Sequence, residues 1–278
     1  MKIYAFADEA SPFIDGQIEA MKRNGLSGLE IRNVDNINVS DITADKAREV
    51  RKKMDNAGLC VWSIGSPIGK IGITDDFAAH LDKLKHTIEI ADILGSKNIR
   101  MFSFYIDAGK NPSDYRNEVI DRLGMMAQIA SSCDVALCHE NEKGIYGDNA
   151  ERCLDILDNV SGLKCIFDPA NFVQCGQDVN AAWDMLGSRV YYMHIKDALA
   201  DGSVVPAGYG IGAVKRVVGE FLKNGGNALT VEPHLTVFSG LANLEREGEK
   251  SVVGKFQYPD CDTAFDTACD AIKTILKG

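Results

Sequence analysis

The chain has 278 residues, of which 45% are hydrophobic and 25% charged, and its formal net charge is −10 at pH 7. This composition is typical of a folded globular protein and argues against a disordered chain. It also argues against nucleic acid and anionic membranes as partners, because both are bound mainly through clustered Lys and Arg, and no such cluster stands out.

The N-terminal segment and the cysteines indicate a reduced, soluble, cytoplasmic protein. Asp8 and Glu9 come too early for the apolar region of a signal peptide. No apolar run approaches the roughly 20 residues of a membrane span. The eight cysteines form no C-x-x-C pair, and several lie inside apolar runs, which is typical of buried free thiols.

Short apolar runs alternate with helical patterns from one end of the chain to the other. The runs are Ile3–Phe6, Gly28–Arg32, Leu59–Ile64, Asn98–Tyr105, Val135–His139, Leu163–Phe167, Val190–His194 and Ala228–Val231. They are continuous rather than alternating, as expected for parallel strands covered on both faces. Eight such repeats without a Pro- or Ser-rich linker predict one α/β domain over residues 1–278, a (β/α)8 TIM barrel. The alternative is a doubly wound open sheet, which usually has a glycine-rich first turn that this chain lacks.

Four successive runs in the second half each lead to a residue type that commonly binds metals. These residues are Glu140, Asp168, His194 and Glu232. In a barrel the carboxyl ends of the strands meet at one mouth, so we expect the four side chains to converge. Three carboxylates and one imidazole suit Mn²⁺, Mg²⁺, Co²⁺ or Zn²⁺. Each residue alone could instead cap a helix or pair with a Lys or Arg, but four in succession favour a metal site.

Four short motifs surround these residues. They read His139-Glu140-Asn141-Glu142, Phe167-Asp168-Pro169-Ala170-Asn171-Phe172, His194-Ile195-Lys196-Asp197 and Val231-Glu232-Pro233-His234. Together they resemble the sugar phosphate isomerase/epimerase superfamily of xylose isomerase-like TIM barrels, clearly over the last four runs and loosely over the whole chain. The resemblance implies that Glu140, Asp168, His194 and Glu232 hold one divalent metal. It also implies that the two glutamates flank the substrate as an acid/base pair.

The chemistry of this superfamily explains such an arrangement. Moving a proton next to a sugar carbonyl passes through an enediolate, whose negative charge a divalent metal stabilises. Carboxylates on opposite faces give epimerisation, whereas a shuttle along one face gives aldose–ketose isomerisation. We therefore predict a metal-dependent isomerase or epimerase of a small carbohydrate or sugar phosphate, acting through Glu140 and Glu232.

Three further residues are predicted to contact the substrate. Lys196 follows His194 closely, although a surface pair with Asp197 is the alternative. His234 lies two residues beyond Glu232, so strand alternation would point it the same way. Asn171 stands where ketose 3-epimerases usually carry His, and this departure weighs against a strict ketose 3-epimerase.

Several other features carry weaker predictions. The glycine-rich turn 206–212 could bind phosphate after the seventh run, although such loops also occur without phosphate. Glu30 and Arg32 are predicted either to support the floor of the site or to pair with each other. His139 should point into the core. The stretch 239–261 is predicted to be a long loop over the barrel mouth.

Other functions remain open from the sequence. A lyase of the inosose-dehydratase type would use the same site to eliminate water, and a non-catalytic sugar-binding barrel would keep the metal without turnover. An abasic-site endonuclease would need more than the five histidines of this chain and a basic face. The expected partner is a small carbohydrate. Barrels of this group often form dimers or tetramers, so a homo-oligomer also stays open.

Overall fold

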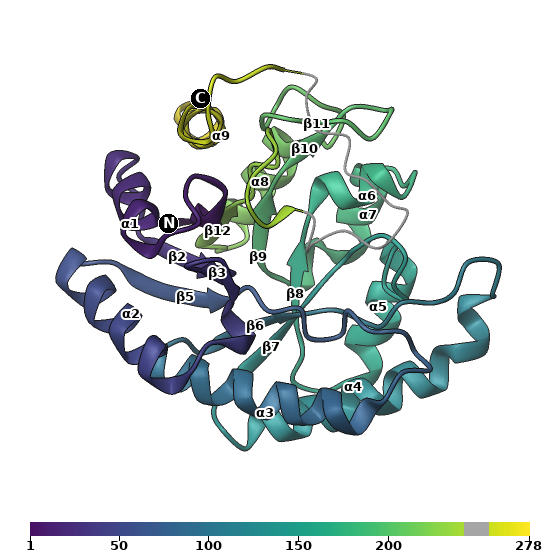
Figure 1. Ribbon diagram of the computed structural model, residues 1–278. Helices are drawn as coiled ribbons and strands as arrows, with labels where there is room; N and C mark the ends of the chain where they lie inside the picture. The colour runs from purple at the N-terminus through teal and green to yellow at the C-terminus, as the bar shows by residue number, and fades with distance from the viewer. Residues whose placement is uncertain (242–255) are drawn as a thin grey trace.

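The barrel is closed and parallel. The computed structural model describes residues 1–241 and 256–278. Eight parallel strands follow one another around the barrel in the order β1-β12-β9-β8-β7-β6-β5-β2, and β2 pairs with β1 to close it. Helices surround the strands (Figure 1). The predicted (β/α)8 TIM barrel is therefore confirmed, and the open sheet is wrong.

The barrel strands coincide with the eight predicted runs. They are β1 (Lys2–Ala5), β2 (Gly28–Ile31), β5 (Cys60–Ile64), β6 (Asn98–Met101), β7 (Ala136–Glu140), β8 (Lys164–Phe167), β9 (Val190–Ile195) and β12 (Ala228–Val231). The main difference is β6, which ends well before the predicted Tyr105. Phe104 has a φ of 65°, a left-handed conformation that a strand does not accommodate.

The connections between the strands supply the helices and two small hairpins. The described α-helices are α1 (Ile14–Arg23), α2 (Ala44–Ala57), α3 (Phe77–Leu94), α4 (Arg116–Ser131), α5 (Ala150–Asn159), α6 (Pro169–Gln174), α7 (Val179–Leu186), α8 (Val214–Lys223) and α9 (Cys261–Lys277). The hairpins pair β3 (Asn33–Val34) with β4 (Ile37–Asn38), and β10 (Asp197–Ala198) with β11 (Val204–Val205). Local sequence sets the ends of α2, where Thr43 accepts a hydrogen bond from the Lys46 amide and Gly58 adopts a φ of 69°.

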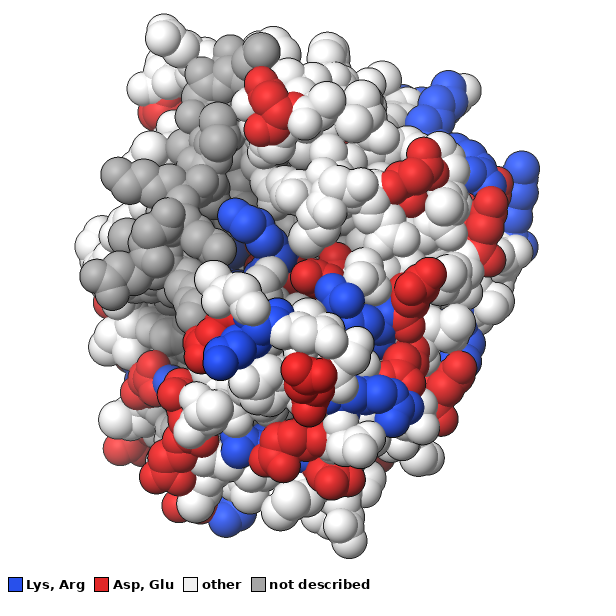
Figure 2. Space-filling model, turned by 90° about the vertical axis from the view of Figure 1, so that its right-hand side faces the viewer, with Lys and Arg blue, Asp and Glu red and all other residues white. Residues whose placement is uncertain are grey.

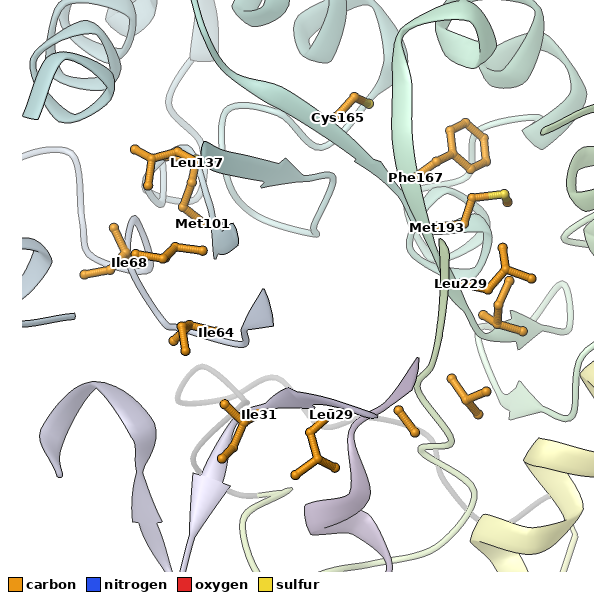
Figure 3. Packing of buried hydrophobic residues seen from close by; sticks show 14 of the residues in the cluster. Leu29, Ile31, Ile64, Ile68, Met101, Leu137, Cys165, Phe167, Met193 and Leu229 are labelled. Atoms are coloured by element: carbon orange, nitrogen blue, oxygen red, sulfur yellow. The ribbon is translucent and has the colours of Figure 1, made fainter. Parts of the chain in front are cut away.

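Side-chain alternation along the strands separates an outer apolar layer from the barrel interior. Leu29 and Ile31 belong to the large cluster between strands and helices, whereas Glu30 between them points the opposite way. Figure 3 shows the outer side chains in a ring around the barrel. Tyr192 belongs to a separate interior cluster, and His194, two residues further along β9, shares its side of the strand. Polar residues at the strand ends are thus directed into the barrel mouth.

The outside of the molecule carries charges of both signs. On the face shown in Figure 2, Lys and Arg side chains lie among Asp and Glu side chains. No described helix is both long enough and apolar enough to cross a membrane. Most of the predicted loop 239–261 lies outside the described residues.

Candidate metal centre

The four predicted ligands meet at the carboxyl ends of their strands. Glu140 is the last residue of β7, His194 lies near the end of β9, and Asp168 and Glu232 directly follow β8 and β12. One ligand atom from each residue lies within 4.8 Å of the ligand atoms of the others. All four side chains are buried. The predicted convergence is therefore present, and its cause is the parallel register of the barrel.

His194 lies at the centre of the cluster. Its Nδ1 is 2.9 Å from Glu140 Oε1 and 3.5 Å from Glu232 Oε2. Its Nε2 is 3.1 Å from Glu30 Oε2. Burial lowers the pKa of His194, but the carboxylates of Glu140 and Glu30 outweigh that effect and hold the pKa well above its usual value. Without a metal ion the imidazole is protonated on both nitrogens.

The two oxygens of Asp168 differ: one accepts a hydrogen bond, and the other has only an ion pair with Lys196. Its Oδ1 accepts a hydrogen bond from the backbone amide of Asn171 and caps the N-terminus of α6. Its Oδ2 is buried and accepts no hydrogen bond from the described residues, although Lys196 Nζ lies 3.0 Å away. Burial raises the pKa of Asp168 to about 7; Lys196 opposes this shift, and Glu232 and Glu140 add to it. A buried carboxylate oxygen that accepts no hydrogen bond and lies among other carboxylates is a position that a metal cation would stabilise.

The charges around the cluster do not balance. When all are ionised, six buried carboxylates face four buried cations among the described residues: Asp8, Glu9, Glu30, Glu140, Asp168 and Glu232 surround Arg32, Arg100, Lys196 and the protonated His194. Buried charge is costly unless it is neutralised. An excess of negative charge and an oxygen-rich donor set with one imidazole both suit a divalent cation. The residues present therefore fit the predicted metal.

We expect the stabilisation of the protein by Mn²⁺ to grow with pH. In the metal-free protein the pKa of Asp168 is raised from 3.8 to about 7, so between these values the folded state binds more protons than the unfolded state. Its free energy of unfolding should therefore fall as pH rises through this window. Metal binding needs the deprotonated carboxylate and competes with that proton.

This pH dependence can be measured by thermal denaturation with and without saturating Mn²⁺. The increase in Tm caused by the metal should be clearly larger at about pH 8 than at about pH 6. Equal increases at both pH values would contradict the expected competition between proton and metal.

The three predicted substrate residues also lie at the cluster. Lys196 Nζ is 3.0 Å from Asp168 Oδ2 and 3.1 Å from Glu232 Oε2, so the alternative of a surface pair with Asp197 is wrong. Asn171 Nδ2 donates to Glu140 Oε1 at 3.3 Å. His234 Nε2 lies 3.6 Å from Glu232 Oε1 and has no hydrogen-bond partner among the described residues. Their contact with substrate stays a prediction.

Two buried arginines complete the site, and the sequence analysis did not assign either to the glutamates. Arg32 Nη1 lies 3.4 Å from Glu232 Oε1, and Arg100 Nη1 lies 3.3 Å from Glu140 Oε2. The Phe6 ring packs against both guanidinium groups, at 4.6 Å and 4.9 Å. The signal that could have found Arg100 is a charged residue inside an otherwise apolar run.

Arg32 pairs with Asp8 and Glu9 and not with Glu30, so the predicted pairing of Glu30 with Arg32 is wrong. Its Nε lies 2.9 Å from Asp8 Oδ2, and its Nη2 lies 3.0 Å from Glu9 Oε1. Glu30 contacts His194 instead. Burial raises the pKa of Glu9 to about 8, against the lowering effect of Arg32. His139 lies in the core as predicted, with Nε2 3.0 Å from Ser103 Oγ.

The glycine-rich turn after β9 is organised by a carboxylate of the protein itself. The amides of Gly208, Gly210 and Gly212 donate to the Asp197 side chain at 2.9, 3.0 and 2.8 Å. The Ala198 amide donates to the same carboxylate. Because these donors already have an anionic partner, the arrangement does not favour phosphate binding by this turn.

We expect Asp197→Asn to destabilise the fold strongly. An amide nitrogen in place of Oδ2 would face the amides of Gly208 and Gly210, so buried donors would lose their acceptor. The loss should be about 3 kcal/mol in the free energy of unfolding, measured by urea denaturation. As a control, Asp184→Asn removes an exposed pair with Arg216 and should change stability by less than about 1 kcal/mol. A wild-type unfolding midpoint for Asp197→Asn would contradict this role.

The sequence of the chain matches one known protein family. The model of the family described as Xylose isomerase-like TIM barrel matches residues 18–247. The chain belongs to this family. A comparison with curated proteins gave no match.

Solved structures of this xylose isomerase-like fold align over nearly the whole chain. The IOLI protein with a zinc atom has a TM-score of 0.77 at 14% identity, covering 100% of this chain and 98% of that one. D-psicose 3-epimerase in the presence of D-fructose has a TM-score of 0.76 at 16% identity and covers 100% of both chains. The probable 3-DHS dehydratase AsbF from Bacillus anthracis has a TM-score of 0.74 at 15% identity, covering 98% and 99%. At these identities the likeness concerns the fold.

Proposed function

We propose that the protein is a divalent-metal-dependent isomerase or epimerase of a small carbohydrate or sugar phosphate, with residues 1–278 as one domain. The observation that carries the proposal is the buried cluster of Glu140, Asp168, His194 and Glu232, whose ligand atoms lie within 4.8 Å of one another. It supports the proposal because the donor set and the excess negative charge both suit a divalent ion. The sugar epimerase among the structural neighbours agrees with it.

The proposed metal would be held by all four residues of the cluster. Bound there, a divalent ion would supply Lewis-acid stabilisation of negative charge that develops on the substrate. By fixing the place of that ion, the four side chains would also orient the substrate toward the glutamates.

Glu140 and Glu232 are the proposed acid/base pair. They come from β7 and β12, which are separated in the barrel by β8 and β9, so their carboxylates reach the cluster from different directions. Burial would raise the pKa of Glu232, but Lys196, His234 and His194 together outweigh it and hold the pKa well below the usual value. Glu232 is therefore ionised at neutral pH and suited to accept a proton from carbon. Glu140 would hold or return a proton on the other side of the substrate.

Lys196, His234 and Asn171 are the proposed substrate contacts. Burial lowers the pKa of Lys196, but Asp168 and Glu232 raise it above its usual value, so the ammonium stays charged and can donate to a substrate oxygen. Burial holds the pKa of His234 well below its usual value, and its Nε2 is available to a hydroxyl group. The Asn171 side-chain amide would donate to a hydroxyl or carbonyl oxygen in place of its 3.3 Å hydrogen bond to Glu140 Oε1.

A lyase that eliminates water from a cyclic polyol ketone is the second candidate. Two observations favour it: Asn171 replaces the histidine usual in ketose 3-epimerases, and a probable dehydratase aligns with the chain over 98% of its length. The same metal and the same glutamates would serve this reaction, because abstraction of a proton next to a carbonyl is common to both.

The experiment is a mass-spectrometric screen of the Mn²⁺-loaded protein in deuterium oxide against ketoses, inososes and their phosphates. An isomerase or epimerase should exchange a carbon-bound hydrogen for deuterium while the product keeps every heavy atom of the substrate. A dehydratase product should lack one water. Binding of metal and sugar with no turnover on any member of the panel would contradict the enzyme and favour a sugar-binding barrel.

A further inference from the structure

Glu30 reaches His194 across the inside of the barrel. Glu30 lies on β2 and His194 on β9, two strands that are not neighbours in the barrel order. Even so, Glu30 Oε2 is 3.1 Å from His194 Nε2. Both side chains are completely buried. This contact therefore depends on the closed barrel.

The second oxygen of Glu30 is also held. Tyr192 donates its hydroxyl to Glu30 Oε1 at 2.8 Å, and Ser63 donates to the same oxygen at 3.3 Å. The hydroxyls of Ser63 and Tyr192 are themselves 3.2 Å apart. With both oxygens engaged, the carboxylate cannot rotate away from the imidazole.

The two nitrogens of His194 face different surroundings. Nδ1 points to Glu140 Oε1 and Glu232 Oε2, which are the proposed metal ligands, and Nε2 points to Glu30. An imidazole offers a lone pair on Nδ1 only when the remaining proton is on Nε2. An acceptor at Nε2 keeps the proton there, fixes the plane of the ring and makes Nδ1 a stronger ligand.

A buried carboxylate is expensive, and an apolar side chain would fill the same space without that cost. The free-energy cost of burying Glu30 would be offset if its charge strengthens metal binding through the imidazole of His194. The hydrogen bonds from Tyr192 and Ser63 then serve to orient the carboxylate rather than to neutralise it.

We propose that Glu30 is a positioning residue for the metal site, which sets the tautomer and the donor strength of His194 toward a divalent ion bound at Nδ1. This inference rests on the metal site of the proposed function. It assigns to Glu30 a role in metal affinity, without contact to the metal or the substrate.

The test compares Mn²⁺ binding by the full-length protein and its Glu30→Gln variant, using isothermal titration calorimetry at one pH. The Gln side chain preserves the size and can still accept from Nε2, but it carries no charge. We expect a Kd for Mn²⁺ that is about 10–100-fold higher. A control should stay within about threefold of the parent: Glu220→Gln, the same chemical change on α8, outside the barrel interior.

A second measurement does not depend on how the variant folds. Nitrogen-15 NMR of the Zn²⁺-loaded parent should show His194 with its proton on Nε2 and the metal on Nδ1. Metal on Nε2, or a folded Glu30→Gln variant that binds Mn²⁺ as tightly as the parent, would overturn the role of Glu30 and leave the proposed function intact. A parent protein that binds neither Mn²⁺ nor Zn²⁺ would overturn both proposals.

Discussion

Replacing Glu140 or Glu232 with Gln should lower kcat by roughly 10²–10⁴-fold, the range expected when a positioned acid or base is lost. The amide keeps an oxygen that can bind a cation, but it cannot take up a proton at neutral pH. KM should change much less than kcat, because the substrate contacts of Lys196 and His234 remain. The measurement is steady-state kinetics on the substrate that the mass-spectrometric screen identifies.

Two further measurements make the result for the glutamates interpretable. At saturating Mn²⁺, metal analysis of both variants should find bound Mn²⁺, and circular dichroism should match the parent. Glu220→Gln, on the outside of the barrel, makes the same chemical change and should keep the parent kcat. Near-normal turnover in either Glu140→Gln or Glu232→Gln would remove that residue from the acid/base pair.

Asp168→Asn should weaken Mn²⁺ binding by more than about 100-fold. Loss of a residue that only hydrogen-bonds a metal ligand already lowers metal affinity by roughly 10–100-fold, and Asp168 is itself a proposed ligand. The Asn side chain can keep Oδ1 as the cap of α6, so the fold should survive. It puts a neutral group where Oδ2 now lies without a hydrogen bond. Calorimetric titration measures the loss of affinity, and urea denaturation of the metal-free variant checks the fold.

Asp168→Asn and Glu232→Gln should also differ in how they respond to added metal. Activity of Asp168→Asn should rise with Mn²⁺ concentration, because the acid/base pair is intact. Glu232→Gln should stay inactive at any concentration of Mn²⁺. If saturating Mn²⁺ restored both variants equally, Glu232 would be a ligand without a proton-transfer role.

Much of the barrel could be predicted because its strands carry local signals. Continuous apolar runs such as Ala228–Val231 identify strands buried on both faces, and the residue at the end of each run faces the mouth by alternation. The convergence of Asp168 and Glu232 follows from these two facts. The end of β6 could not be predicted, because the left-handed turn at Phe104 has no glycine to mark it.

The contacts inside the barrel could not be predicted from local pattern. Glu30 meets His194 only because the sheet closes and curves, which brings β2 and β9 within reach across the barrel, whereas Arg32 meets Asp8 because they follow the neighbouring strands β2 and β1. Pairing Glu30 with Arg32 was the natural alternative, since they are two residues apart. In the structure the two side chains have different partners, His194 for Glu30 and Asp8 for Arg32.

The Phe6 ring between the two guanidinium groups links the two halves of the site mechanically. Each arginine contacts one glutamate of the proposed acid/base pair, and both arginines pack against the same ring. A smaller residue at this position would let both arginines shift, so the separation between the two carboxylates would change from both ends at once. During divergence to new substrates, the spacing of these carboxylates would then depend in part on the size of the Phe6 side chain, and the effects of substitutions at Arg32 and Arg100 are expected to be non-additive.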